Sequence, residues 1–426
     1  MAASEWAEPV GSATSGNQTP GSALPPRLRM MSPEKGRAVT DVVRLGIVGF
    51  GAQGSVYARM VADGKIPGMA LGAIADRNSE RRAVIAQEHP DTPLYSGHEE
   101  LIGGGGVDAV ITTLPHYDHP KVAIAALEAG LHVLVEKPAA VYTTQVRELI
   151  EAAEARPELT FAIMFNQRTN PLYRRIKEIV AAGEIGAIRR SSWTITTWWR
   201  PKGYYEQSAW RATWGGEGGG VLVNQAPHQL DLWQWICGVP QSVFAKAAFG
   251  FRRDIAVEDE VTAVVDYGDG VTGVFITATH DLIGTDRFEI LGDRGKIVVD
   301  GSAVATVTRL TKDEREISAS IGPEDVRRMF RGEMKLDQFQ ETEEISFDSA
   351  WGSQHGEVLR NFAAHILDGE PLLAPGAEGI NGVRLANAIH LSAWLGEEVP
   401  IDFDEDLYLA ELNQRIRDEG KFPERS

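Results

Sequence analysis

The chain has 426 residues, enough for two domains with full cores, and its formal net charge of -18 argues against nucleic acid as a partner, because phosphate binding needs clustered Lys and Arg. Its single cysteine, Cys237, excludes an internal disulfide and a cysteine-built zinc site, and it favours a reducing cytoplasm. No apolar run approaches the length of a membrane span. Residues 1–40 lack the apolar stretch of a signal peptide, and their Pro, Gly, Ser and Ala content predicts a disordered tail.

The first predicted elements are a buried strand over residues 42–48 and a helix over residues 55–62. Between them stand three glycines with the spacing GxGxxG. The first glycine of such a motif permits a tight turn, the second lets a pyrophosphate approach the backbone, and the third lets the helix pack against the strand. We therefore assign the whole loop to dinucleotide binding: Gly49, Phe50, Gly51, Ala52, Gln53 and Gly54.

Asp76 follows the next predicted strand, residues 71–75. An acid about 20 residues beyond a glycine motif is expected to bind the adenosine ribose. Arg77 stands beside it, and an Arg can pair with a 2′-phosphate that a carboxylate would repel. We expect NAD, with NADP possible. The alternative is an ordinary glycine turn in some other α/β protein.

Helical and strand patterns alternate up to about residue 182, which predicts a parallel sheet covered on both faces. The predicted strands are 107–114, 132–135 and 160–165, and the predicted helices are 80–88, 119–129, 144–155 and 171–182. From about Ala187, strand-like segments with hairpin turns at 268–270 and 292–295 predict a mainly antiparallel sheet, before helices return over 353–396. The expected fold class is α/β, with a doubly wound parallel sheet and a second α/β domain.

Glu136 and Lys137 end a predicted strand directly before Pro138. The carboxyl ends of strands in an open parallel sheet face the ligand crevice, so we expect both side chains at the cofactor and Lys137 at the substrate. The proline holds Lys137 in extended backbone. The alternative is a surface lysine at a strand end.

The sequence GGGVLVNQAPHQLD, residues 218–231, is the second segment that carries chemistry. With Asn224 as N-cap, Pro227 falls in the first helical turn, and Asn224, His228 and Asp231 share one face. A histidine with a pKa near neutrality can accept a hydroxyl proton, and a carboxylate behind it can fix its tautomer. The alternatives are capping alone for Asn224 and a core histidine for His228.

The region from residue 165 to residue 235 is rich in Trp, Tyr, Arg and Asn, side chains that suit the C–H faces and hydroxyls of a sugar. Its segment 199–214 is expected to form a loop over the pocket, and most of its tryptophans are expected in the core. We select Arg168, Tyr204 and Arg211 as substrate-binding residues. We expect no metal at His116 and His119, because prolines flank them and no further ligands accompany them.

Together these motifs resemble those of the Gfo/Idh/MocA oxidoreductases, named for glucose-fructose oxidoreductase and inositol dehydrogenase. The resemblance extends from Val42 to about Leu412 and includes GFGAQG, Asp76, the stretch TLPHYDHPKVAIAALEAGLHVLVEKP and GGGVLVNQAPHQLDLWQW. It implies a tail over 1–40, an NAD(P)-binding Rossmann domain over 41–165, and a substrate-binding and oligomerisation domain over 166–426, with final helices that can pack back on the first. It also implies a homodimer or homotetramer.

The resemblance further implies reversible oxidation of a sugar or cyclitol hydroxyl. Lys137 would hydrogen-bond the reacting oxygen and His228 would accept its proton. The family places four residues beside the cofactor: Thr113, Leu114, Pro115 and His119. Asn224 departs from the Asp of inositol-dehydrogenase-like members, and Pro227 replaces a common glycine; an Asn cannot be a base, although it can still bind a substrate hydroxyl.

Three functions therefore stay open at this point. The favoured one is a dehydrogenase acting on a sugar, sugar derivative or inositol, with no nucleic acid or membrane partner. A second is an enzyme that retains NAD and uses transient oxidation for elimination or glycoside cleavage. A third is a non-catalytic NAD-binding regulator, against which the presence of both Lys137 and His228 argues.

Overall fold

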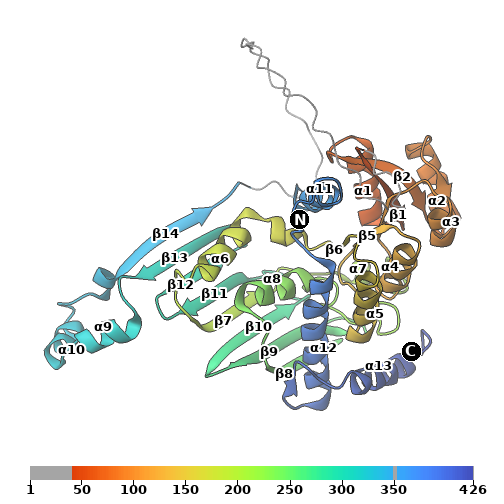
Figure 1. Cartoon of the computed structure of the whole chain (residues 1–426). Coiled ribbons are helices and arrows are strands. Elements are labelled where there is room, and N and C mark those ends of the chain that lie inside the picture. Colours follow the sequence, from red (N-terminus) through yellow and green to blue (C-terminus); the bar gives the residue numbers. More distant parts are fainter. Residues whose placement is uncertain (1–40, 349–352, 426) are drawn as a thin grey trace, which may run out of the picture. The chain divides into compact units, whose positions relative to one another are not determined.

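The computed structural model of the protein describes residues 41–348 and 353–425, so the tail predicted over residues 1–40 lies outside the described residues. The first half of the chain alternates strands and helices as predicted (Figure 1). Its elements are β1 (Val43–Val48), α1 (Ala52–Ala62), β2 (Met69–Ala75), α2 (Ser79–Glu88), β3 (Leu94–Tyr95), α3 (His98–Gly103), β4 (Ala109–Thr112), α4 (Asp118–Glu128), β5 (His132–Val135), α5 (Thr143–Glu154) and β6 (Phe161–Ile163).

These strands form a six-stranded sheet in the order β3-β2-β1-β4-β5-β6, and every pairing is parallel. The chain leaves β1 towards β2 on one side and later returns to β4 on the other. This change of direction opens a crevice at the carboxyl ends of β1 and β4, where a ligand binds in folds of this kind. The doubly wound parallel sheet predicted from the sequence is confirmed.

Apolar side chains cover both faces of this sheet, as buried parallel strands require. Leu45 and Ile47 pack in one cluster with α1 and with Phe362 of α11 (Ser353–Asp368), whereas Val110 and Val133 pack in another with α4. Helix α11 therefore belongs to the core around β1, although about 300 residues separate the two elements in the sequence.

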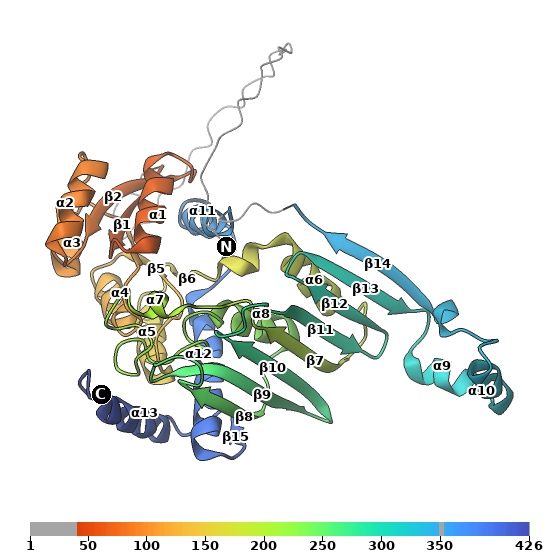
Figure 2. The same ribbon diagram turned by 180° about the vertical axis from the view of Figure 1, so that it is seen from behind.

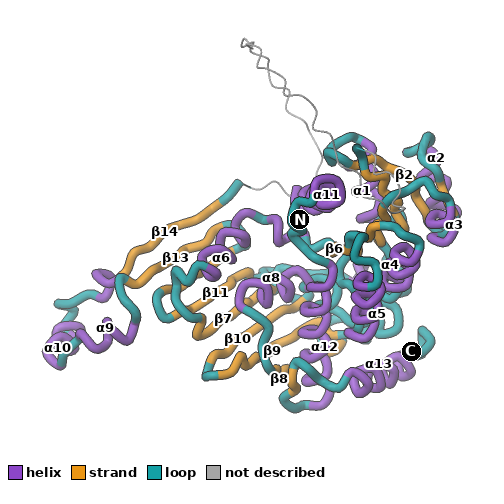
Figure 3. The backbone as a smooth tube through the Cα atoms, viewed as in Figure 1, coloured by secondary structure: helices purple, strands orange, loops and turns teal. Residues whose placement is uncertain are grey.

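The second half of the chain begins with η1 (Asn166–Thr169) and α6 (Pro171–Ala181) and contains a nine-stranded sheet (Figures 1 and 3). Its order is β14-β13-β12-β11-β7-β10-β9-β8-β15, with all pairings antiparallel except β7 with β10. The strands are β7 (Ile188–Ile195), β8 (Ser242–Phe249), β9 (Glu258–Gly268), β10 (Val271–Ala278), β11 (Asp286–Gly292), β12 (Gly295–Asp300), β13 (Val304–Leu310), β14 (Gln340–Ser346) and β15 (Val399–Pro400).

Helices α6, α8 (Pro227–Cys237) and α12 (Gly379–Leu395) lie on one face of the large sheet (Figure 1). In the opposite view, the strands of the sheet lie in front of these helices (Figure 2). Trp233 of α8 stacks on Phe275 of β10 with 5.5 Å between ring centroids. The mainly antiparallel second sheet is thus confirmed, and so are the hairpin turns at 268–270 and 292–295.

Several elements were not predicted, and their polarity explains why. Strand β14 has the sequence QETEEIS, of which only Ile345 is buried, so it lacks the apolar alternation of a strand and instead shows the charges of a protected sheet edge. The missed α-helices are α3, α7 (Lys202–Tyr205), α9 (Glu314–Ser320), α10 (Pro323–Phe330) and α13 (Glu405–Glu419). Within the described ranges, no helix is both long and apolar enough to cross a membrane. The domain boundaries given above stay a prediction.

Candidate active site

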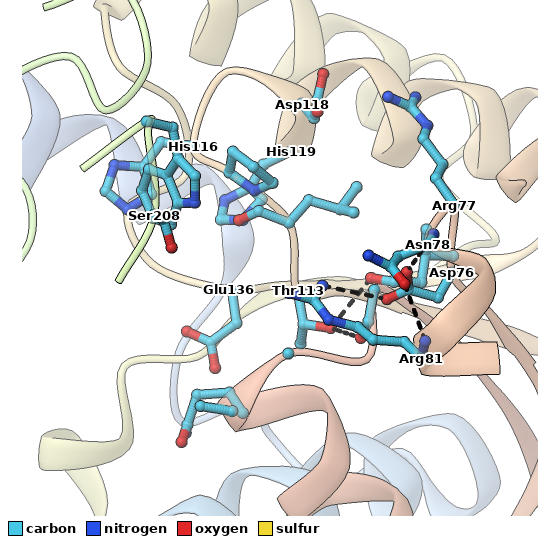
Figure 4. Close-up of a pocket in the computed structure, with 18 of the residues that line it drawn as sticks. Asp76, Arg77, Asn78, Arg81, Thr113, His116, Asp118, His119, Glu136 and Ser208 are labelled. Carbon is cyan, nitrogen blue, oxygen red and sulfur yellow. Dashed lines mark hydrogen bonds and ion pairs between the residues drawn. The ribbon is translucent and has the colours of Figure 1, made fainter. Parts of the chain in front are cut away.

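A cavity of about 590 Å³ opens at the carboxyl ends of β1, β2, β4 and β5, and the segment 207–224 closes its other side. Figure 4 shows Asp76, Asn78 and Arg81 grouped at one end and His116 with Ser208 at the other. Fourteen of the predicted residues line it: Gly49, Gly51, Ala52, Gln53, Asp76, Arg77, Thr113, Leu114, Pro115, His119, Glu136, Lys137, Arg211 and Asn224. Five others stand outside its lining: Phe50, Gly54, Arg168, Tyr204 and His228.

The glycine loop has the geometry that a pyrophosphate requires. Gly49 has a φ of +96°, and a Cβ there would come within 2.4 Å of the Thr113 carbonyl oxygen. A Cβ at Gly54 would come within 2.1 Å of the Gly49 oxygen, whereas one at Gly51 would meet no atom of the described chain within 4 Å and would enter the cavity. Gly51 is also the N-cap of α1, with no side-chain cap. The three glycines therefore fit a dinucleotide cofactor.

These contacts predict opposite outcomes for two alanine variants. Gly54→Ala is expected to lower the free energy of unfolding by about 1–3 kcal/mol, because its Cβ overlaps backbone. Gly51→Ala should leave stability near that of the wild type and weaken NAD binding, since its methyl group occupies phosphate space. Urea unfolding and NADH fluorescence titration measure the two effects, with Gly103→Ala, which meets open space away from the cavity, as the control. Equal effects of Gly51→Ala and Gly103→Ala on NADH affinity would contradict this assignment.

Asp76 joins the end of β2 to the glycine loop. Its Oδ2 accepts a hydrogen bond from the Phe50 backbone N–H at 2.8 Å and lies 3.6 Å from Arg81 Nη1, while its Oδ1 accepts from the Asn78 N–H at 2.8 Å. The carboxylate lines the cavity, at the position where an acceptor for a ribose hydroxyl is expected. Arg77 and Arg81 line it too, so the same end of the cavity offers cations to a 2′-phosphate.

His119 lines the cavity beside the wall formed by Thr113, Leu114 and Pro115. Its Nδ1 lies 2.9 Å from the Pro138 carbonyl oxygen and its Nε2 lies 2.8 Å from the Leu114 carbonyl oxygen. The ring therefore ties the loop after β4 to the loop after β5, and the cofactor would pass over this wall. Burial lowers the pKa of His119.

Glu136 and Lys137 stand at the end of β5, as predicted. The Glu136 carboxylate accepts hydrogen bonds from the Tyr57 hydroxyl and, at 3.0 Å, from the Lys137 backbone N–H. The Lys137 ammonium donates to the Asn224 carbonyl oxygen at 3.0 Å. Burial lowers the pKa of Lys137, although Glu136 and Glu217 oppose this shift. Lys137 is thus a cavity-lining cation held by both halves of the protein.

Asn224 does not cap a helix, and this corrects the prediction. Helix α8 begins at Pro227 with Ala226 as its N-cap, whereas the Asn224 N–H belongs to a preceding turn in which it donates to the Gly220 carbonyl oxygen at 3.1 Å. The Asn224 side chain instead donates from Nδ2 to Glu217 Oε1. Pro227 does occupy the first helical turn, as predicted.

His228 lies close enough to Lys137 for their charges to interact, but its surroundings differ from the prediction. Burial lowers its pKa well below the usual value, with the charge of Lys137 and His355 adding to the effect, so the ring is neutral near pH 7. Its Nδ1 has no hydrogen-bond partner among the described residues. Asp231 therefore does not fix its tautomer.

Asp231 pairs with Arg168 instead, so Arg168 lies in a buried ion pair outside the cavity lining, whereas it was predicted to bind substrate. Arg168 donates from Nε and Nη2 to the two carboxylate oxygens of Asp231 at 2.8 and 2.6 Å, and from Nη1 to Glu378. Both Arg168 and Asp231 are 1% exposed. The sequence signalled an arginine at a strand end, but not the direction of its side chain.

Arg211 lines the cavity, and Tyr204, which stands outside the lining, contacts the Arg211 guanidinium. Arg211 Nη1 donates to the Tyr204 hydroxyl at 2.7 Å, and its guanidinium lies 4.6 Å from the centre of the Tyr204 ring. Trp210, Gln207 and Ser208 also line the cavity, in agreement with the predicted loop over the pocket. Trp193, Trp214 and Trp233 are buried, as expected of core residues.

Sequence reasoning missed other residues at the cavity. His116, Asn78, Arg81, His98 and Asp118 line it. Glu217 lies directly behind Asn224 and is 2% exposed. An acid between two runs of glycine was the available signal for Glu217. No group of three or more possible metal ligands occurs in the part of the chain that the structure describes.

Two family models match the chain. The "Oxidoreductase family, NAD-binding Rossmann fold" model matches residues 43–163, and the "GFO/IDH/MocA C-terminal domain" model matches residues 173–298. The chain is 32% identical to inositol 2-dehydrogenase 1 of Saccharopolyspora erythraea, over 60% of this chain and 73% of that protein. It is 26% identical to myo-inositol 2-dehydrogenase of Thermotoga maritima, over 81% of this chain and 95% of that protein.

Solved structures share the fold. A levoglucosan dehydrogenase in complex with NADH matches with a TM-score of 0.71 at 19% identity, covering 85% of this chain and all of that one (100%). The WlbA dehydrogenase of Bordetella pertussis, in complex with NADH and UDP-GlcNAcA, matches with a TM-score of 0.69 at 24% identity, covering 86% and 100% of the two chains.

Proposed function

We propose that this chain, which belongs to the Gfo/Idh/MocA family of NAD-binding oxidoreductases, is a dehydrogenase that interconverts a hydroxyl and a carbonyl on a sugar, sugar derivative or cyclitol. One observation carries the proposal: a single cavity is lined by the glycine loop of a dinucleotide fold and by the ammonium-bearing Lys137. The names of the inositol dehydrogenases and of the levoglucosan dehydrogenase support the substrate class.

Residues of the first sheet would hold the cofactor. The N–H groups around Gly51 would bind the phosphates, Asp76 would accept a hydrogen bond from the adenosine ribose, and Thr113 to Pro115 would form the wall beside it. When bound, NAD or NADP supplies the hydride acceptor, nicotinamide C4. Lys137, at the carboxyl end of β5, would then contact the reacting oxygen of the substrate.

Lys137 and His228 would bind the reacting hydroxyl and accept its proton. An ammonium at Lys137 donates a hydrogen bond to the reacting oxygen, and because burial lowers its pKa, it gives up a proton more readily than an exposed lysine. His228, which the family resemblance implies as the proton acceptor, is neutral near pH 7 and stands outside the cavity lining, with no hydrogen-bond partner for its Nδ1 among the described residues. We propose Arg211 and Asn224 as further contacts to substrate hydroxyls.

We also propose a cytoplasmic location, which the single cysteine favours, and a homo-oligomer, which the open face of the large sheet supports. Phe244 and Val264 are cross-strand neighbours on β8 and β9, and they are 40% and 44% exposed. Exposed apolar neighbours of this kind suit contact with a second copy.

The experiment that tests the function is a turnover screen with purified protein. NAD or NADP is mixed with inositols, aldoses and glycosides, and the near-ultraviolet absorbance of the reduced nicotinamide is followed. Steady formation of the reduced cofactor with one group establishes the dehydrogenase and its substrate class. A change limited to one equivalent per protein would point instead to a retained cofactor, and binding without any reduction would favour a regulator.

A further inference from the structure

Glu217 is a buried acid that none of the steps above uses. It lies in the turn between the 199–214 loop and the segment that carries Asn224, and it is 2% exposed. Its Oε2 accepts a hydrogen bond from the Ala212 backbone N–H at 2.6 Å, and its Oε1 accepts from Asn224 Nδ2. One oxygen of this buried carboxylate binds the side chain of a cavity-lining residue. The carboxylate therefore influences which polar atom of that side chain is left to bind a ligand.

The hydrogen bond decides which end of the Asn224 amide faces the cavity. An ionised carboxylate only accepts hydrogen bonds, so the amide nitrogen must point to Glu217 and the amide oxygen away from it. Asn224 lines the cavity, and no donor in the described chain reaches its Oδ1. Its backbone oxygen accepts a hydrogen bond from the Lys137 ammonium at 3.0 Å, so position 224 adjoins the cavity-lining lysine.

We propose that Glu217 is a positioning residue that holds the Asn224 amide with its oxygen towards the cavity, so that position 224 accepts a hydrogen bond from a substrate hydroxyl near the one bound by Lys137. This inference rests on the proposed function and specifies its substrate as a polyol with a free hydroxyl at that point. A substrate with a carbonyl or ether oxygen there would lack the donor.

The charges around Glu217 give the arrangement a pH dependence. Arg211 Nη1 lies 3.9 Å from Oε1, and Lys137 also interacts with the carboxylate, whereas Glu258 is a like charge. Burial raises the pKa of Glu217 to about 7. Because Oε2 already accepts from Ala212, a proton added below that pH sits on Oε1, which then donates, and the Asn224 amide turns over.

Two isosteric substitutions test the orientation without any substrate. In Glu217→Gln, the new oxygen accepts from Ala212 and the new amide group faces Asn224, so the Asn224 amide must reverse. In Asn224→Asp, two carboxylates face each other and stability falls at a pH well above 7. In the double variant, the new amide at position 217 donates to the new carboxylate at position 224, and an acceptor again faces the cavity. We expect the thermal midpoint of Asn224→Asp to drop by several degrees at high pH and to recover in the double variant.

Activity then tests the positioning role, with myo-inositol and the hydroxyl-bearing sugars of the screen as probes. Each single variant is expected to lose about tenfold in kcat/KM, the scale of one hydrogen bond to a buried polar group, and the double variant to return to within a few fold of the wild type. NADH affinity should stay unchanged in all three. Glu419→Gln is the matched control, since Glu419 accepts from the Trp214 N–H at 2.7 Å in the same region without touching Asn224.

Independent, additive losses of thermal stability in Glu217→Gln and Asn224→Asp would overturn the inference, as would coupling of equal size between Glu419→Gln and Asn224→Asp. So would single variants with unchanged kcat/KM in an active protein. If the wild type turns over none of the probes while the stability coupling holds, the proposed function fails and the orientation of Asn224 stands.

Discussion

Lys137→Ala is expected to lower turnover by about 10²- to 10⁴-fold, the range that general acid–base catalysis contributes, while NADH affinity stays within a few fold of the wild type. Lys137 lines the cavity at the carboxyl end of β5, and its ammonium donates to the carbonyl oxygen of Asn224, another lining residue, at 3.0 Å. The glycine loop and Asp76, which would bind most of the cofactor, do not depend on it. Stopped-flow turnover and NADH fluorescence titration separate the two effects.

The pH profile adds a second test of Lys137. Burial lowers its pKa, so the ammonium is lost at a lower pH than in an exposed lysine, and activity that needs it falls on the alkaline side. This alkaline limb should disappear in Lys137→Ala. His228→Ala should instead remove an acidic limb, which lies below the usual histidine pKa because the pKa of His228 is lowered. A Lys137→Ala variant with normal turnover would remove this residue from the mechanism.

Structural features that depend on residues close together in the sequence could be predicted. The glycine turn depends on the positive φ of Gly49 and on the close approach of Gly54 to the Gly49 carbonyl oxygen, and both are recorded in the local spacing of the glycines. Lys137 was predictable for a related reason, since the end of a parallel strand faces the crevice whatever the neighbouring strands are.

Features that depend on side-chain direction could not be predicted. Arg168 and Asp231 are 63 residues apart, and only the packing of η1 against α8 brings them together. Asp231 shares a helix with His228, and its spacing suggested a partner for the ring, but a bidentate arginine is the stronger partner for a buried carboxylate. Glu217 was missed because hydrogen bonding to Asn224 depends on how the glycine-rich turn folds.

Arg168→Ala is expected to lower the free energy of unfolding by about 3–5 kcal/mol, because it leaves the buried carboxylate of Asp231 without its cation and with Gln234 as its remaining side-chain donor. Both members of the pair are 1% exposed, so water does not replace the lost hydrogen bonds. Urea unfolding followed by tryptophan fluorescence measures the loss. Asp231→Asn should cost less, since its amide oxygen can still accept from Arg168.

The double variant Arg168→Met, Asp231→Leu separates stability from function at this position. Replacing both ions with apolar side chains of similar volume removes the cost of burying charge, so its stability should recover most of what Arg168→Ala loses. If Arg168 acts only within the ion pair, the KM of this variant stays near that of the wild type. A stable double variant with a strongly raised KM would instead return Arg168 to the substrate site, and it would mean that the ion pair opens when substrate binds.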